Sequence, residues 1–67
     1  MNGTVKRIAR DKGFGFIQSN RQDGGKDYFF HYSALKNIKF ELLQEGQEVT
    51  FEDVDTPKGL RAEQIFV

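Results

Sequence analysis

Residues 27–32 read Asp-Tyr-Phe-Phe-His-Tyr, the most informative run in the chain. Side chains alternate between the two faces of a β-strand, so Tyr28 and Phe30 share one face while Phe29 and His31 share the other. A small β-domain has one core, and only one of these faces can line it. The other face therefore holds an aromatic ring and an imidazole in solvent.

Residues 14–17, Phe-Gly-Phe-Ile, repeat this arrangement, with Phe14 and Phe16 on one face of the expected strand and Ile17 on the other. Exposed rings interleaved with Lys and His suit unstacked bases, because every base has a π-face and each stack contributes about 1–3 kcal/mol. Two other interpretations are a protein partner on the rings and a strand buried on both sides. The residues favour single-stranded nucleic acid over both.

Short β-like runs separated by polar turns extend outward from these two stretches. A loop over residues 20–25 carries an Asp-Gly-Gly turn signal, the connection 33–46 contains a Ser-Ala-Leu that fits one 3₁₀ turn, and residues 55–59 form a Pro- and Gly-containing turn. The expected strands are residues 4–8, 14–18, 27–32, 49–52 and 60–67. Five short strands predict an all-β barrel or sandwich, and closure into a barrel removes the exposed edges. We expect one domain over residues 1–67.

Composition excludes several other classes of protein. The chain has 67 residues, of which 37% are hydrophobic, and this composition fits neither a disordered segment nor a membrane protein. There is no Cys, which excludes disulfides and thiolate metal sites, and the N-terminus has no signal-peptide pattern, so we expect a cytoplasmic protein. His31 is the only His and has no partner nucleophile, and no phosphate-binding loop is present. We therefore expect no metal, no cofactor and no enzymatic activity.

Charge is unevenly distributed along a chain whose net charge is zero. Residues 1–39 hold eight Lys and Arg against three Asp, a net charge of +5, whereas residues 40–67 hold two basic residues against seven acidic ones, a net charge of −5. Such a chain can present one positive face to a polyanion. Ordinary salt bridges between the two halves are the alternative.

The two aromatic stretches resemble the ribonucleoprotein-type motifs of bacterial cold shock proteins. Residues 12–17, Lys-Gly-Phe-Gly-Phe-Ile, are similar to the first motif, and residues 27–35 are similar to the second. Further similarity lies in residues 3–6, 43–47 and 58–59, so the resemblance covers essentially the whole chain. It implies the five-stranded antiparallel oligonucleotide/oligosaccharide-binding (OB) barrel.

The resemblance also implies which residues contact nucleic acid. Lys6 and Lys12 suit phosphates or base edges, Lys58 clamps the strand from the last loop, and Asp27 accepts a hydrogen bond from a base edge. Taken alone, Phe40 fits a core residue equally well, and Asp27 could instead accept backbone hydrogen bonds at a hairpin end. The stacking residues implied by position are Phe14, Phe16, Phe29, His31, Tyr32 and Phe40.

The first strand departs from the family pattern. Cold shock proteins usually have Lys-Trp-Phe-Asn where this chain has Lys6-Arg7-Ile8-Ala9. Arg7 replaces a strong stacking ring with a guanidinium, which can also stack and adds a fixed charge. We therefore expect weaker and more salt-dependent binding than is usual for the family.

Two inward positions are also unusual. Tyr28 and Phe30 stand where the family commonly has smaller residues, and Gly15, Ile8 and Ala9 are candidates for the compensating space. For Arg61, an ordinary solvated strand residue is slightly favoured over a contribution to the basic clamp.

The predicted function is binding of single-stranded RNA and DNA by a monomer, with the resemblance implying an ATP-independent RNA chaperone or a regulator of transcription or translation. The alternative is a protein-interaction module that uses the same aromatic face. No membrane or small-molecule substrate is expected.

Overall fold

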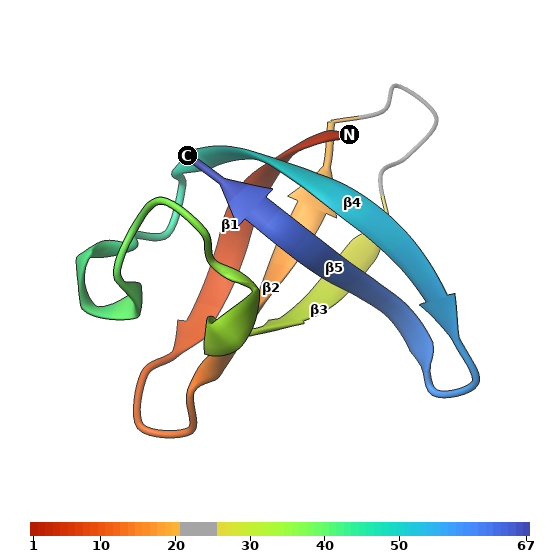
Figure 1. Cartoon of the computed structure of the whole chain (residues 1–67), viewed down its shortest axis with the longest axis horizontal. Helices are drawn as coiled ribbons and strands as arrows, with labels where there is room; N and C mark the ends of the chain where they lie inside the picture. Colours follow the sequence, from red (N-terminus) through yellow and green to blue (C-terminus); the bar gives the residue numbers. More distant parts are fainter. Residues whose placement is uncertain (21–25) are drawn as a thin grey trace.

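The computed structural model describes residues 1–20 and 26–67, whose five strands close into a barrel in the order β1-β2-β3-β5-β4 (Figure 1). Two 3₁₀ helices, η1 (Tyr32–Ala34) and η2 (Phe40–Leu42), occupy the connection between β3 and β4. The strands are β1 (Asn2–Ala9), β2 (Phe14–Ser19), β3 (Asp27–His31), β4 (Glu48–Thr56) and β5 (Gly59–Phe66). The predicted five-stranded barrel is confirmed. Its pairs are antiparallel except β3 with β5, which run parallel and share one register pair, Phe29 with Arg61.

Some element boundaries differ from those expected. Tyr32 begins η1 instead of ending the third strand, and its backbone N–H bonds to the carbonyl of Gly13 in the β1–β2 turn. The fourth strand continues to Thr56 because it pairs with β5 as far as Gly59, which shortens the predicted turn. The predicted Asp-Gly-Gly turn lies outside the described residues. Among the described residues, no helix is long and apolar enough to cross a membrane.

The inner face of β3 lines the core as the alternation predicts. Phe30 is fully buried and Tyr28 is 4% exposed, whereas Phe29 and His31 on the other face are partly exposed. Gly15, opposite Phe30 across the β2–β3 pair, supplies the space for the larger ring. A Cβ atom at Gly15 would lie 2.7 Å from the Phe30 ring and 2.6 Å from the carbonyl oxygen of Arg7, both too close for real atoms. The expected compensation at Gly15 is confirmed.

Two irregularities reset the strand alternation. In β1 the register with β2 shifts between Val5 and Arg7, so Lys6 is an extra residue and Arg7 stands opposite Phe16. A β-bulge of this kind places two successive side chains on the outer face. In β5, Gln64 has a φ of 52°, next to the register shift between β4 and β5, and Ile65 after it is fully buried.

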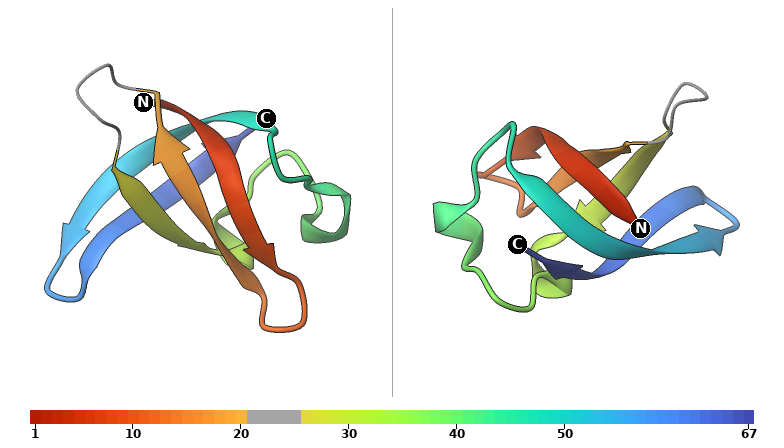
Figure 2. Two further views of the ribbon diagram at one scale, coloured as in Figure 1. Left: turned by 180° about the vertical axis from the view of Figure 1, so that it is seen from behind. Right: turned by 90° about the horizontal axis from the view of Figure 1, so that it is seen from above.

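The two long hairpins place their turns on the same side of the barrel, the lower side in Figure 1, one toward the left and the other toward the right. The β1–β2 turn and the β4–β5 turn extend in the same direction and stand apart from each other when seen from either side (Figures 1 and 2). The outer surfaces of β2 and β3 form the wall of the barrel between β1 and β5. This wall carries the outward aromatic residues.

Candidate nucleic-acid interface

The register aligns outward side chains into rows that run across the sheet. One row consists of Arg7, Phe16, Phe29 and Arg61, which stand opposite one another on β1, β2, β3 and β5. Residues directly opposite each other in a sheet have neighbouring side chains on the same face. Two phenyl rings are thus flanked by an arginine on either side.

Three phenylalanines of β2 and β3 form a single cluster on this face. The centroid of the Phe14 ring lies 5.4 Å from that of Phe29 and 6.1 Å from that of Phe16, and Phe16 and Phe29 are 5.9 Å apart. These are ordinary distances for interacting aromatic pairs. All three rings remain partly exposed, so they form an apolar surface that is open to solvent.

The aromatic surface continues from β3 into the two 3₁₀ helices. The ring centroids of His31 and Tyr32 are 4.4 Å apart, and those of Tyr32 and Phe40 are 6.2 Å apart. His31 Nδ1 lies 3.0 Å from Ser33 Oγ, which leaves the Nε2 edge of the imidazole for other partners. We call the six residues together the aromatic track: Phe14, Phe16, Phe29, His31, Tyr32 and Phe40.

Phe40 has a double role in this arrangement. It packs against the core, with its ring centroid 6.5 Å from that of Phe30, and it also lies next to the exposed Tyr32. The two interpretations of Phe40 from the sequence, core residue and surface residue, therefore both describe part of its environment.

Arg10, which the sequence did not single out, holds the turn that carries Phe40. Its Nη1 donates to the carbonyl oxygens of Phe40 at 2.9 Å and Glu41 at 3.2 Å, and its Nη2 donates to the carbonyl oxygen of Leu43. These carbonyls belong to η2 and its C-terminal end, so the guanidinium caps this short helix. No sequence signal distinguishes such an arginine from a solvated one in a turn.

The β1 bulge brings charged side chains to one edge of the aromatic track. Lys6 Nζ lies 3.1 Å from Asp27 Oδ2 in an exposed ion pair. Lys6, Arg7, Phe16 and Asp27 line a pocket of about 410 Å³, which we call the Arg7 pocket. The Asp27 carboxylate thus accepts a hydrogen bond from Lys6. From the sequence, its candidate donors were a base edge and backbone N–H groups.

A second groove lies at the opposite edge of the track. It has a volume of about 680 Å³ and is lined by Phe16, Phe29 and the β4–β5 turn from Thr56 to Arg61, which includes Lys58. Thr56 Oγ1 donates to the carbonyl oxygen of Gly59 at 2.8 Å and accepts from the Lys58 N–H at 3.3 Å, bonds that shape the turn. Arg61 lines this groove beside Phe29, and its partly exposed side chain is paired with Glu63 at 3.1 Å, so the solvated strand residue and the contribution to the basic clamp both stay open. In the sequence, the alternation of Arg61 with the core residue Ala62 was the signal that its side chain points outward.

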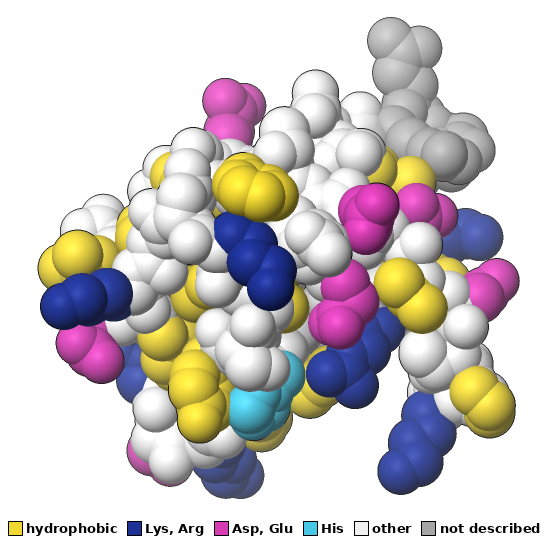
Figure 3. Space-filling view, viewed as in Figure 1, with side chains coloured by type: hydrophobic (Ala, Val, Ile, Leu, Met, Phe, Trp, Pro, Cys, Tyr) yellow, Lys and Arg dark blue, Asp and Glu magenta, His cyan; other side chains and the backbone are white. Residues whose placement is uncertain are grey.

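The structure thus brings most of the predicted site residues together. Ten of them form or border the aromatic track and its two grooves, and the exposed Lys12 lies in the β1–β2 turn. In Figure 3 the single histidine, in cyan, adjoins hydrophobic side chains, and acidic side chains gather toward β4 and β5.

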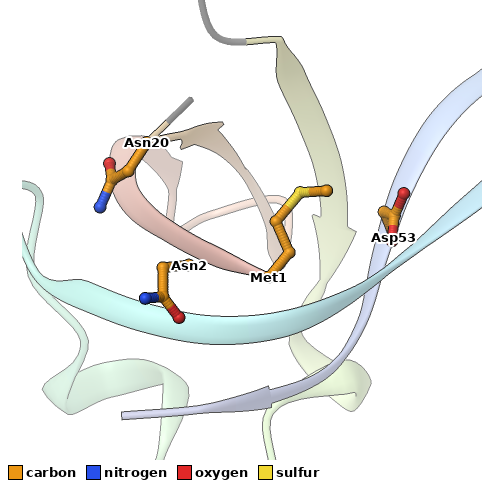
Figure 4. A pocket seen from close by; sticks show the side chains of 4 residues that line it. All are labelled: Met1, Asn2, Asn20 and Asp53. Atoms are coloured by element: carbon orange, nitrogen blue, oxygen red, sulfur yellow. The ribbon is translucent and has the colours of Figure 1, made fainter. Parts of the chain in front are cut away.

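Another hollow, away from the track, has different chemistry. The described residues lining it are Met1, Asn2, Asn20 and Asp53 (Figure 4). Their polar groups do not converge, since the Met1 side chain lies between Asn20 and Asp53. Residues 1–20 and 26–67 also contain no cluster of His, Cys, Asp or Glu that could hold a metal ion.

Comparison with known proteins agrees with this geometry. The 'Cold-shock' DNA-binding domain family model matches residues 1–67. The chain is 48% identical over 64 residues to the cold shock-like protein CspA of Shewanella violacea, covering 96% of this chain and 89% of that one. It is 45% identical over 67 residues to the cold shock-like protein CspB of Escherichia coli, covering 100% of this chain and 92% of that one. It is also 43% identical over 65 residues to a cold shock-like protein of Aquifex aeolicus, covering 97% and 90% of the two chains.

The match extends over the entire barrel, including all five strands and the aromatic track. It assigns the chain to nucleic-acid-binding proteins and not to enzymes. The chain therefore belongs to the cold shock domain family.

Proposed function

We propose that the protein binds single-stranded RNA and single-stranded DNA along the aromatic track and acts as an ATP-independent RNA chaperone. The observation that supports this most strongly is the cluster of Phe14, Phe16 and Phe29, three rings within about 6 Å of one another that stay partly exposed on one wall of the barrel. Bases stack on such rings with little dependence on sequence. A duplex hides its base faces, so the track selects unpaired strands.

Cationic groups on both sides of the track supply the second component of binding. Lys6 and Arg7 border one edge, Lys58 borders the other, and Lys12 lies in the β1–β2 turn. Lysine and arginine next to a backbone release its counterions, which makes binding dependent on salt. In this proposal Asp27 accepts hydrogen bonds from a base edge while it remains paired with Lys6.

Chaperoning follows from preferential binding of the unpaired form. A ligand of open strands shifts a hairpin equilibrium toward opening by mass action and needs no nucleotide hydrolysis. The same binding at a defined transcript would regulate transcription or translation. We place the protein in the cytoplasm, as a monomer, because RNA folding takes place there and one barrel carries the whole track.

The test is a titration of the protein with short oligothymidine and oligouridine, followed by NMR. We expect the largest shifts at the aromatic track and at the turns on either side of it, and affinity that falls as salt rises. If no shift appears at high micromolar oligonucleotide, or if shifts spread evenly over β4 and β5, the proposal is wrong. The protein-interaction alternative would then account for the exposed rings.

A further inference from the structure

The Arg7 pocket combines three kinds of chemistry. Phe16 supplies an aromatic wall, Lys6 and Arg7 supply hydrogen-bond donors with positive charge, and Asp27 supplies a carboxylate. The pocket exists because the bulge at Lys6 directs two successive basic side chains outward beside the phenyl ring. At the other edge of the track, the described groove residues include no carboxylate, and the nearby Glu63 carboxylate is paired with Arg61 at 3.1 Å.

The pocket is open to a ligand in its present form. The side chains of Lys6 and Asp27 are 52% and 47% exposed, and Lys6 bonds only Oδ2 of the carboxylate. Within residues 1–20 and 26–67, Oδ1 of Asp27 has no donor and Arg7 makes no ion pair or side-chain hydrogen bond. A carboxylate oxygen and a guanidinium therefore face the pocket with hydrogen-bonding capacity to spare.

These groups match one nucleobase best. Guanine presents two adjacent donors, N1–H and N2–H, next to the acceptors O6 and N7. A carboxylate accepts from the two donors, and Arg or Lys donates to the two acceptors. Uracil and thymine have one N–H between two carbonyl oxygens, so one carboxylate oxygen can accept from it while the other is repelled by a carbonyl. Adenine and cytosine each offer a single amino group.

We propose that the Arg7 pocket recognises a guanine base at one position of an otherwise sequence-tolerant single strand, with Asp27 on its Watson–Crick edge and Arg7 on O6 or N7. This inference rests on the proposed function, since the strand must first lie along the aromatic track. Lys6 balances the charge of Asp27 and so limits its repulsion of the strand. A tryptophan at position 7 would offer a stacking ring with a single neutral N–H donor, and not the paired, charged donors of a guanidinium for O6 and N7.

The experiment measures dissociation constants for a short oligothymidine and for a set in which each position in turn is replaced by dG, dA or dC. We expect dG at one position to bind roughly 5- to 20-fold more tightly than dT there, the low end for a bidentate contact because the pocket is open to solvent. Deoxyinosine at that position keeps the ring system but lacks the 2-amino group. Deoxyinosine should therefore lose most of the affinity gain of dG over dT. This result separates recognition of the Watson–Crick edge from stacking of the ring.

Protein variants locate the effect. Asp27→Asn replaces one of the two acceptor oxygens with an NH2 donor, so the side chain can no longer accept from N1–H and N2–H together. Arg7→Gln removes the guanidinium. Each variant should bring the dG-to-dT affinity ratio close to one. Asp53→Asn makes the same chemical change as Asp27→Asn on the far side of the barrel and should leave the ratio at the wild-type value. Amide NMR spectra of the three variants check that the barrel is intact.

The outcomes distinguish this inference from the proposed function. If oligothymidine binds and dG gives no advantage at any position, the guanine inference is wrong and single-strand binding stands. If the dG advantage survives Asp27→Asn or is fully kept by deoxyinosine, the Arg7 pocket does not read the base and the inference is also wrong. If no oligonucleotide binds at all, the proposed function fails first.

Discussion

The outer surfaces of β1–β3 and of β4 have opposite chemistry although the two regions share one core. Val5, Ile17 and Phe30 line the core from β1–β3, and Val49 and Phe51 line it from β4. Outside, the first region carries the aromatic track bordered by Lys6 and Arg7. The second carries four exposed acidic residues, Glu48, Glu52, Asp53 and Asp55, which project from both sides of β4 and are together called the acidic face.

The surface charge of the barrel is therefore asymmetric, although its net charge is zero. A strand of phosphates is repelled by the acidic face and attracted to the basic edges of the track, so it meets the rings in one orientation. The same core supports both surfaces because strand alternation separates inner from outer side chains. Folding and recognition thus use different residues of the same strands.

The largest expected effect comes from removing a ring at the centre of the track. Phe29→Ala should weaken oligothymidine binding roughly 5- to 150-fold, since a base stack contributes about 1–3 kcal/mol. Phe66→Ala removes an exposed ring of β5 and is the matched control, with no expected change in affinity. Titrations measure the affinities, and thermal unfolding checks that both variants are folded. If the two variants bind equally weakly, the track is not the preferred binding surface.

Replacing Arg7 with an aromatic residue makes the track more aromatic and less charged. Arg7→Trp should bind oligothymidine about fivefold more tightly, the low end for a stack because the guanidinium it replaces also contributes. The slope of log K against log salt should become shallower by about 0.7 for each phosphate that the variant no longer neutralises. Titrations across a salt series measure both quantities. Unchanged affinity together with an unchanged slope would contradict this account of Arg7.

A smaller effect is expected from Arg10, which supports the track without belonging to it. Arg10→Ala frees the turn that carries Phe40, so affinity should fall roughly threefold, and unfolding free energy should fall by about 1–2 kcal/mol. Hydrogen exchange should accelerate at Leu42 and Leu43, whose N–H groups bond within this turn. Lys39→Ala removes a charge at the start of the same turn and serves as the control. Were Lys39→Ala to have the same effects, charge and not the bonds to the carbonyl oxygens would be the cause.

The smallest effect is expected from the acidic face. Glu52→Gln combined with Asp53→Asn should raise affinity less than about twofold at 0.15 M salt, where the Debye length is about 8 Å. At low salt the gain should grow, because repulsion between the acidic face and the phosphates is then less screened. Binding measured at two ionic strengths tests this. A tenfold gain at 0.15 M salt would mean that the strand lies close to β4 and not only along the track.

Much of this fold and candidate site could be predicted from local patterns. Alternation over residues 27–31 identified Phe30 as inward and Phe29 as outward, and the small Gly15 was a candidate for the space Phe30 needs. Each prediction depends on neighbours within a strand or on side-chain volume. The bonds of Arg10 to the carbonyl oxygens of η2 and the place of Arg61 opposite Phe29 could not be predicted, because these neighbours lie about 30 residues away along the chain.

Periodicity alone predicted five short strands with aromatic residues on both faces, because a period of two needs no knowledge of distant residues. It left a barrel and a sandwich open, and the family resemblance implied the barrel. The resemblance placed Arg7 at an exposed stacking position, but the bulge at Lys6 that turns it outward beside Phe16 became visible only in the folded barrel. Uninterrupted alternation from the buried Val5 would have put Arg7 inside and Ile8 outside. The physical reason is that barrel closure sets the register between strands, and register decides which side chains become neighbours.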